Sequence, residues 1–421
     1  MKQDTHAASA TSAGVSHIQL MGAEWKRAWR PGIAALMAGS LGYSLYPAVS
    51  SLFVEPLQQQ FGWSRGDIAF VHSFGLITAF IAPVIGRMTD HYGVRPILSA
   101  GLLLTVIGYV LLAMMGGSTS YYYAAYFFFN IAGMATTGIT VTRILSGAFE
   151  HTRGTALALG RSGLAIAGAL MPMLLFPVLT RFGTAGGYLV LAGFILCIAF
   201  PLIWFWVPAR SVELKAGRIK ATEKAEAWHV LLAKPKVRIL IAASVLNYVP
   251  VVALLSQMKP LAIDKGLDAV TAVGAVSVMG AAAAMGALLS GVLVDRFWAP
   301  AIAFVLNLAP ALGCLLLLQA NVPPAIFYGA VLMIGLGQGA EIDIVAFMIA
   351  RYFGLRSYAT IYSLSVLGIG LGVAVGASLI GMAYDHFGNY DVAVMVASAS
   401  FFLAAFFYLA MGRYPPDGAV H

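Results

Sequence analysis

Charged residues are scarce in this chain. Asp, Glu, Lys and Arg make up 10% of the 421 residues, whereas hydrophobic residues make up 60% and the mean hydropathy is +0.85. Soluble domains carry about 25% charged residues, so a globular chain of this composition could not keep its surface hydrated. The composition excludes a soluble enzyme and a nucleic-acid-binding domain, and it indicates a chain embedded in a lipid bilayer.

Cysteine and the common catalytic motifs are also nearly missing. The chain holds only Cys197 and Cys314, each within an apolar segment, which excludes a disulfide framework. It contains no GxxxxGK[ST] phosphate loop, no HExxH or Cys/His cluster and no GxSxG elbow. We therefore expect no ATP-driven reaction, no metal site, no cofactor and no enzymatic activity.

Long apolar segments fill most of the chain instead. Twelve of them suit membrane helices, each of which needs about 20 apolar residues to cross a bilayer. They cover residues 31–53, 67–87, 96–116, 121–145, 154–178, 186–207, 238–258, 269–293, 299–318, 324–350, 357–382 and 390–412. We predict an all-α membrane protein with twelve transmembrane helices in two pseudo-symmetric six-helix bundles.

The basic residues predict the orientation of these helices. Only four of the 25 Lys and Arg residues fall in expected outer loops, namely Arg65, Arg181, Lys259 and Lys265. Such a bias places both chain ends in the cytoplasm. The predicted division is an N-terminal tail (1–30), a first bundle (31–207), a cytoplasmic linker (208–237), a second bundle (238–412) and a C-terminal tail (413–421).

One motif repeats in the two halves. Residues Gly86 to Arg95 read GRMTDHYGVR between two apolar segments, and a reduced copy, GVLVDR, covers Gly291 to Arg296 half a chain later. Phe182-Gly183 and Phe387-Gly388 repeat at the same offset. Two copies of one membrane unit are typical of transporters whose halves move around a central site.

The first of these motifs resembles the loop between helices 2 and 3 of the major facilitator superfamily. Shorter segments are similar to bacterial monocarboxylate and oxalate/formate-type members: FGWSR at 61–65, AFEHTRGTALA at 148–158, ARYFGLR at 350–356 and YDHFGNY at 384–390. The resemblance implies transport of an organic anion, often with a proton, by a monomer in the inner (plasma) membrane of a bacterium.

The same resemblance implies a conformational latch in the repeated loops. Its residues are Gly86, Asp90, Gly93, Arg95, Asp295 and Arg296. We expect Gly86 to allow close helix approach and Asp90 to accept hydrogen bonds at the N-terminus of helix 11.

The anion-binding residues of the family cannot be carried over. Helices 1 and 11 lack Lys and Arg in their cores, and helix 8 has no charge before Asp295. A different cation must bind an anionic substrate. We predict Arg161 in helix 5 as the first choice, because its planar fork suits a carboxylate, and Arg143 in helix 4 as the second.

Two acids lie inside helix 10, where a charge costs about 2.5–3.5 kcal/mol at the membrane centre. Glu341 and Asp343 are two residues apart, so they point about 200° apart and only one can face a cavity squarely. Either one acid forms a fixed salt bridge with Arg161, which is expected at similar depth and would hold the halves together, or one acid couples protons to transport. His72 is a second candidate proton carrier, although a lone His is more often a packing residue.

Polar and aromatic residues of helices 1, 4, 7, 10 and 11 complete the predicted binding site. They are Tyr43, Tyr46, Asn130, Asn247, Tyr248, Gln338 and Tyr362, and helix-to-helix hydrogen bonding is the alternative role for each. We predict a secondary active transporter that moves an organic carboxylate, a monocarboxylate or an aromatic acid, by proton symport. Proton-coupled efflux of amphipathic drugs and a non-transporting membrane sensor are the alternatives.

Overall fold

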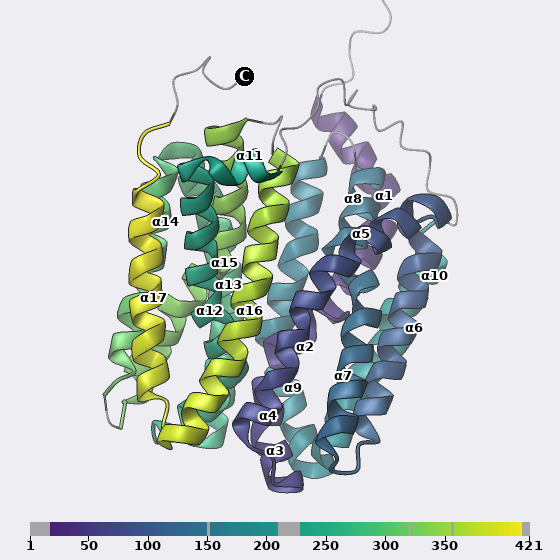
Figure 1. Cartoon of the computed structure of the whole chain (residues 1–421). Helices are drawn as coiled ribbons and strands as arrows, with labels where there is room; N and C mark the ends of the chain where they lie inside the picture. Colours follow the sequence, from purple (N-terminus) through teal and green to yellow (C-terminus); the bar gives the residue numbers. More distant parts are fainter. Residues whose placement is uncertain (1–16, 150–151, 209–227, 320, 355–357, 415–421) are drawn as a thin grey trace, which may run out of the picture.

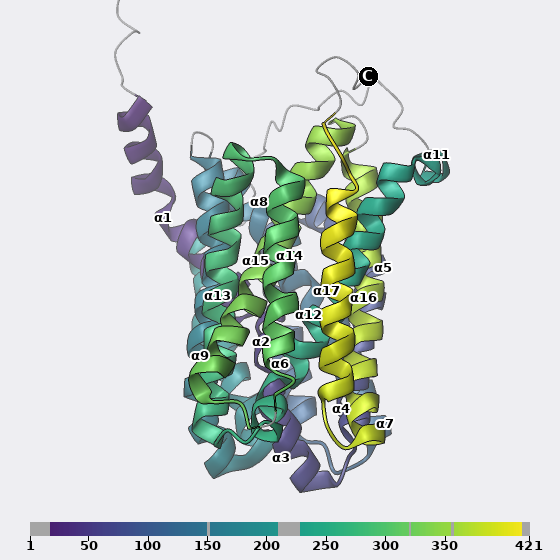
Figure 2. The same cartoon turned by 90° about the vertical axis from the view of Figure 1, so that its left-hand side faces the viewer.

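A computed structural model describes residues 17–149, 152–208, 228–319, 321–354 and 358–414. Within these residues the chain is helical throughout, without a strand. The long helices form two bundles that stand side by side with roughly parallel axes (Figures 1 and 2). We call the helices before residue 209 the first half and those after residue 227 the second half.

The first half contains interrupted helices. Its elements are α1 (His17–Leu41), α2 (Leu45–Val49), α3 (Ser51–Phe61), α4 (Arg65–Phe70), η1 (Val71–Phe74), α5 (Gly75–Tyr92), α6 (Val94–Ala113), α7 (Thr119–Gly133), η2 (Met134–Thr136), α8 (Gly138–Ala148), α9 (Arg153–Phe194), the π-helical turn η3 (Ile195–Ala199) and α10 (Phe200–Trp206). Predicted spans 1, 2 and 4 each correspond to several of these shorter pieces in succession.

One continuous helical stretch of the first half contains two spans. Ser162–Trp206 is 45 residues long, which would measure about 68 Å as a straight helix, against about 30 Å of membrane hydrocarbon. Gly183 breaks it with φ 65° and ψ −166°, a conformation that a residue with a Cβ rarely adopts. The chain therefore reverses at Gly183, as the predicted spans 154–178 and 186–207 require.

The second half consists of long, mostly uninterrupted helices. They are α12 (Pro235–Asp264), α13 (Ala269–Arg296), α14 (Ala299–Leu316), α15 (Pro324–Phe353), α16 (Tyr358–Phe387) and α17 (Asp391–Leu409), preceded by the short α11 (Trp228–Ala233). Each of the six long helices has the length and hydropathy of a membrane span. α11 runs across the bundle rather than along it (Figures 1 and 2); the rest of the predicted linker lies largely outside the described residues.

Glycines set the spacing of helices in the second half. A Cβ on Gly339 of α15 would lie 1.7 Å from the carbonyl oxygen of Ala283 on α13, and one on Gly376 of α16 would lie 2.0 Å from that of Val249 on α12. No side chain fits at either position. Small residues allow this approach, which provides the packing that apolar lipid cannot drive.

The bundle has two recognisable ends. We call the end that carries α11 and the described end of α17 the terminal face, and the other end, where α3 and α4 lie, the opposite face (Figure 1). The halves pack together through α16 against α4, η1 and α5, through α12 against α3, and through α13 against α9. Backbone contact is close at two glycines: a Cβ on Gly280 would lie 2.8 Å from Gly168, and one on Gly381 would lie 2.7 Å from the carbonyl oxygen of Arg65.

Candidate functional site

The breaks in predicted spans 1 and 4 meet each other in the first half, the first between α1 and α2 and the second at η2 between α7 and α8. The chain turns between α1 and α2, and there the backbone N–H of Tyr43 donates to Thr136 Oγ1 in η2 at 2.9 Å. The half-buried Tyr43 ring lies 5.2 Å from that of Phe129, and a Cβ on Gly133 would collide with it. Irregular backbone inside a membrane protein is tolerated where it is buried in protein or lines a cavity, so this junction is a candidate position for substrate contact.

Tyr46 belongs to the core of the first half. Its side chain is 2% exposed, and its hydroxyl shares a hydrogen bond of 3.2 Å with that of Tyr188. Its ring lies about edge-on to Tyr109 and Tyr126. In this conformation the hydroxyl and the ring of Tyr46 contact other side chains of the first half, and substrate binding by Tyr46 stays a prediction.

His72 lies in η1, next to the second half. Its Nδ1 is 3.3 Å from the hydroxyl of Tyr126, and the two rings meet edge to face with centroids 5.8 Å apart. The imidazole is half-buried. Both sequence hypotheses for His72 stay open, because a tyrosine partner suits a packing residue and a proton carrier alike.

Among the predicted polar residues, Asn130 and Gln338 have buried side-chain atoms without a hydrogen-bond partner. Both the oxygen and the nitrogen of the Asn130 side chain are in this state, as is Oε1 of Gln338. Asn130 is 1% exposed and lies in α7, while the half-buried Gln338 lies in α15. Buried polar groups are nearly always paired, so an unpaired one points to a ligand or water.

The other predicted polar residues of the second half differ in their environment. Asn247 donates from Nδ2 to Asn307 Oδ1 at 2.7 Å and is 1% exposed, so it joins α12 to α14. Tyr248 and Tyr362 are half-buried; a Cβ on Gly372 of α16 would lie 3.1 Å from Tyr248. The Oδ1 atom of Asn247 is buried without a hydrogen-bond partner, so substrate contact and the structural role both stay open for Asn247.

Glu341 is buried inside the second half. It is 3% exposed, and its Oε1 accepts a hydrogen bond from the hydroxyl of Tyr408 on α17 at 3.3 Å. Oε2 has no hydrogen-bond partner. Asp343 is half-buried, so the two acids occupy different environments, as their spacing predicts.

The two predicted arginines lie on different elements of the first half. Arg143 is half-buried on α8. Arg161 lies on α9, and its side chain is outside the described part of the structure. The predicted pairing of Arg161 with an acid of helix 10 therefore stays a prediction.

The predicted latch covers the end of α5, Gly93 and the start of α6, with its reduced copy at the end of α13. Gly93 has φ 90°, which explains a glycine there, and the guanidinium of Arg95 lies 4.6 Å from the ring of Trp204. A Cβ on Gly86 would meet nothing within 4 Å, so the close helix contact expected at Gly86 is not seen in this conformation. Arg296 is exposed, and the side chains of Asp90 and Asp295 lie outside the described residues.

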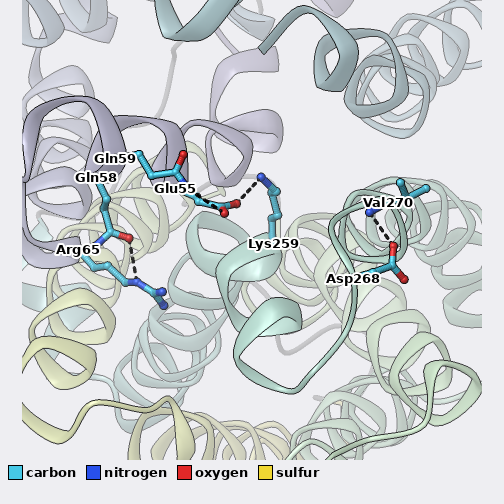
Figure 3. Close-up of polar contacts among 7 residues, drawn as sticks. All are labelled: Glu55, Gln58, Gln59, Arg65, Lys259, Asp268 and Val270. Atoms are coloured by element: carbon cyan, nitrogen blue, oxygen red, sulfur yellow. Dashed lines mark hydrogen bonds and ion pairs between the residues drawn. The ribbon is translucent and has the colours of Figure 1, made fainter. Parts of the chain in front are cut away.

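An ion pair between the halves was not predicted. Lys259 Nζ on α12 lies 2.8 Å from Glu55 Oε2 on α3, near the opposite face (Figure 3). The Lys259 side chain is 5% exposed and that of Glu55 is 38% exposed. The predicted span ended at residue 258 and left Lys259 in a loop, whereas α12 continues to Asp264, so an error of six residues at one helix end hid this buried charge.

A second polar contact between the halves joins two of the sequence motifs. Asp385 accepts hydrogen bonds from the backbone N–H groups of Arg65 and Gly66 at 3.1 and 2.7 Å. The guanidinium of Arg65 stacks over Tyr384 at 3.6 Å from the ring centroid and donates to the hydroxyl of Tyr390 at 2.5 Å. The FGWSR and YDHFGNY segments thus join the two halves at the opposite face. Ser73 and Ser378, whose hydroxyl oxygens are 2.6 Å apart, add a further contact between the halves.

Two halves of six membrane helices each, in contact near one face, form the architecture of a transporter that works by exposing a central site to each side in turn. The chain belongs to the Major Facilitator Superfamily, because the model of that family matches residues 32–364. It is a multi-pass membrane transporter and not an enzyme.

Curated relatives point to one branch of the superfamily. The chain is 23% identical to monocarboxylate transporter 11 of Homo sapiens over 408 residues, which cover 92% of this chain and 84% of the relative. It is 23% identical to monocarboxylate transporter 13 of Bos taurus over 377 residues, which cover 88% of this chain and 86% of the relative. The chain therefore resembles monocarboxylate-type members along nearly its whole length.

Solved structures show the same fold. A nucleoside transporter superposes with a TM-score of 0.77 at 12% identity, covering 91% of this chain and 100% of that one. A D-xylose-proton symporter superposes with a TM-score of 0.74 at 16% identity, covering 94% and 99%. At these identities the likeness concerns the fold alone.

Proposed function

We propose that this transporter moves an organic carboxylate across the membrane together with a proton. The observation that carries the proposal is the similarity to monocarboxylate transporters over 92% of the chain. The local resemblance of the FGWSR segment, which lies in contact with the second half, supports it.

The principal substrate contacts that we propose lie on predicted spans 1, 4, 5 and 10, which correspond to α1–α3, α7–α8, the first part of α9 and α15. Arg161 binds the carboxylate, with Arg143 as the second choice. Tyr43 at the broken backbone, the unpaired side-chain atoms of Asn130 and the unpaired Oε1 of Gln338 orient the rest of the molecule. Tyr248 and Tyr362 complete the site at the second half.

Glu341 is the proposed proton site. A carboxylate held only by a tyrosine hydroxyl, in an environment where its second oxygen has no partner, is costly to keep charged. We infer that Glu341 carries a proton in this conformation and releases it when the halves rearrange. Asp343 and His72 are the alternative proton-carrying groups.

We propose a monomer in the inner membrane, with the terminal face in the cytoplasm. The distribution of Lys and Arg supports this orientation. The opposite face, which the contacts of Lys259 and Arg65 hold closed, then faces the outside.

Uptake by purified protein in liposomes tests the proposal. We expect an inward proton gradient to drive accumulation of radiolabelled lactate, butyrate or benzoate, and Arg161→Ala to abolish it. The same carboxylate should raise the melting temperature of the wild type and not of Arg161→Ala, because a ligand that binds the folded state stabilises it. Stabilisation by cationic amphiphiles alone would favour drug efflux, and ligand binding without any flux would favour a sensor.

A further inference from the structure

Two buried lysines near the end of α12 have different partners. Lys259 pairs with Glu55 of the first half, whereas Lys265 pairs with Asp391 of the second half, its own. The side chains of the two lysines are almost equally buried, at 5% and 6% exposure. Movement of one half against the other separates the first pair and leaves the second intact.

The surroundings of Lys259 suit a carboxylate. Its ammonium lies 2.8 Å from one oxygen of Glu55 and 5.7 Å from the ring centroid of Phe176 on α9. The other oxygen of Glu55 accepts a hydrogen bond from Gln59 at 3.3 Å (Figure 3). The Lys259 ammonium and the Phe176 ring therefore form a carboxylate site between the halves, and in this conformation the carboxylate of Glu55 occupies it.

Opening of the opposite face removes Glu55 from this site. A buried charge that loses its partner is strongly unfavourable. Once the face has opened, the Lys259 ammonium therefore needs water or another anion in place of Glu55. An anionic substrate that enters from this face meets Lys259 before it reaches the centre of the bundle, because Lys259 is only five residues from the end of α12.

We propose that Lys259 is an entry-side binding residue for the substrate carboxylate, and that the carboxylate of Glu55 takes the same place when the opposite face closes. This inference rests on the proposed transport of a carboxylate. It adds a residue that the sequence did not indicate, and it gives Glu55 the role of an internal competitor.

A latch without substrate contact is the competing explanation, and one pair of variants separates the two. Glu55→Gln breaks the ion pair and leaves the ammonium, while Glu55→Gln combined with Lys259→Gln breaks the same pair and removes it. Removal of both partners leaves no unpaired buried charge, so we expect the double variant to fold. A difference in substrate affinity between the two variants then reports on the ammonium itself.

The measurement is the KM for lactate, butyrate and benzoate in right-side-out membrane vesicles, repeated in inside-out vesicles. We expect the entry-side KM of the double variant to exceed that of Glu55→Gln by about tenfold to a hundredfold, the range for a lost hydrogen bond to a charged group. Glu55→Gln itself should lower the entry-side KM or leave it unchanged. Lys259→Arg should retain an entry-side KM within a few-fold of the wild type.

Lys265→Gln is the matched control. It removes an equally buried ammonium from the residue that follows the end of α12, and we expect its entry-side KM to equal that of the wild type. Equal KM values for Glu55→Gln and the double variant would overturn the role of Lys259 while leaving carboxylate transport intact. A wild type that transports none of the three acids would overturn the proposed function and the inference with it.

Discussion

The two halves of this transporter solve helix packing in different ways. The first half has a core of large aromatic side chains, among them Phe53, Tyr109, Tyr126 and Tyr188. Several of its helices are broken into shorter pieces. The second half packs continuous helices through glycine and alanine, with Glu341 buried among them. Pseudo-symmetry of the fold therefore does not require symmetry of the interior, and irregular backbone is concentrated in one half.

The difference suggests a division of labour. Broken helices place main-chain groups and half-buried side chains such as Tyr43 next to a central site, whereas tightly packed helices make a rigid body that can move as a unit. Four substitutions test this division, from the largest expected effect to the smallest.

Glu341→Gln should have the largest effect, because it removes the one acid that we assign to proton movement in the rigid half. We expect uptake driven by a pH gradient to be abolished while exchange of labelled for unlabelled substrate continues. Tyr408→Phe, which removes the hydroxyl that donates to Glu341, should weaken gradient-driven uptake without abolishing it. Unchanged gradient-driven uptake in Glu341→Gln would exclude this role.

Gly339→Ala should destabilise the second half. The added Cβ would overlap the carbonyl of Ala283, and overpacking of this kind costs about 1–3 kcal/mol. Gly329 on the same helix is the control, because a Cβ there would meet nothing within 4 Å. We expect a lower melting temperature for Gly339→Ala and an equal or higher one for Gly329→Ala; similar values for the two would contradict packing by close helix approach.

Thr136→Val tests the junction of the broken helices. The substitution removes the acceptor for the Tyr43 N–H, and a buried donor left without a partner costs about 1–3 kcal/mol. We expect the KM to rise severalfold with a modest fall in melting temperature. Thr105→Val is the control, since Thr105 donates only to Gly101 within its own helix, and its KM should stay at the wild-type value.

Asp268→Ala should have the smallest effect and should depend on pH. Hydrogen bonds from the hydroxyl and backbone N–H of Thr271 hold the pKa of Asp268 below its usual value, and Val270 also donates to it at the start of α13 (Figure 3). A lowered folded-state pKa contributes stability above the unfolded pKa of about 3.9, and this contribution is lost as pH falls through the folded value. The melting temperature of the variant should therefore lie below that of the wild type at neutral pH and approach it in acid; a constant difference would show that the charge is irrelevant.

The sequence predicted the fold well because hydropathy and the repeated loop depend on local composition. All twelve expected spans are present as helices, with spans 5 and 6 joined at Gly183. The site was harder to predict, because a polar residue on a helix can face a cavity or a neighbouring helix. Tyr46 and Asn247 face neighbours, and periodicity alone could not distinguish these cases.

The contact between Lys259 and Glu55 was missed for a different reason. Helix ends carry little signal in an apolar sequence, and the predicted span stopped at residue 258, whereas α12 continues through Lys259 and Pro260 to Asp264. Pairing between α3 and α12 depends on tertiary structure. Only the rule that a charge inside a membrane helix needs a partner could have indicated it.

The contact of Asp385 with Arg65 and Gly66 has a consequence for how this face tolerates mutation. Asp385 binds peptide N–H groups, which every residue except proline possesses. Substitutions at position 65 can therefore change the side chain and leave this recognition in place. Position 66 is different, because a Cβ on Gly66 would lie 2.7 Å from Oδ2 of Asp385. Control of the contact therefore belongs to positions 66 and 385, whereas position 65 is free to vary in its side chain.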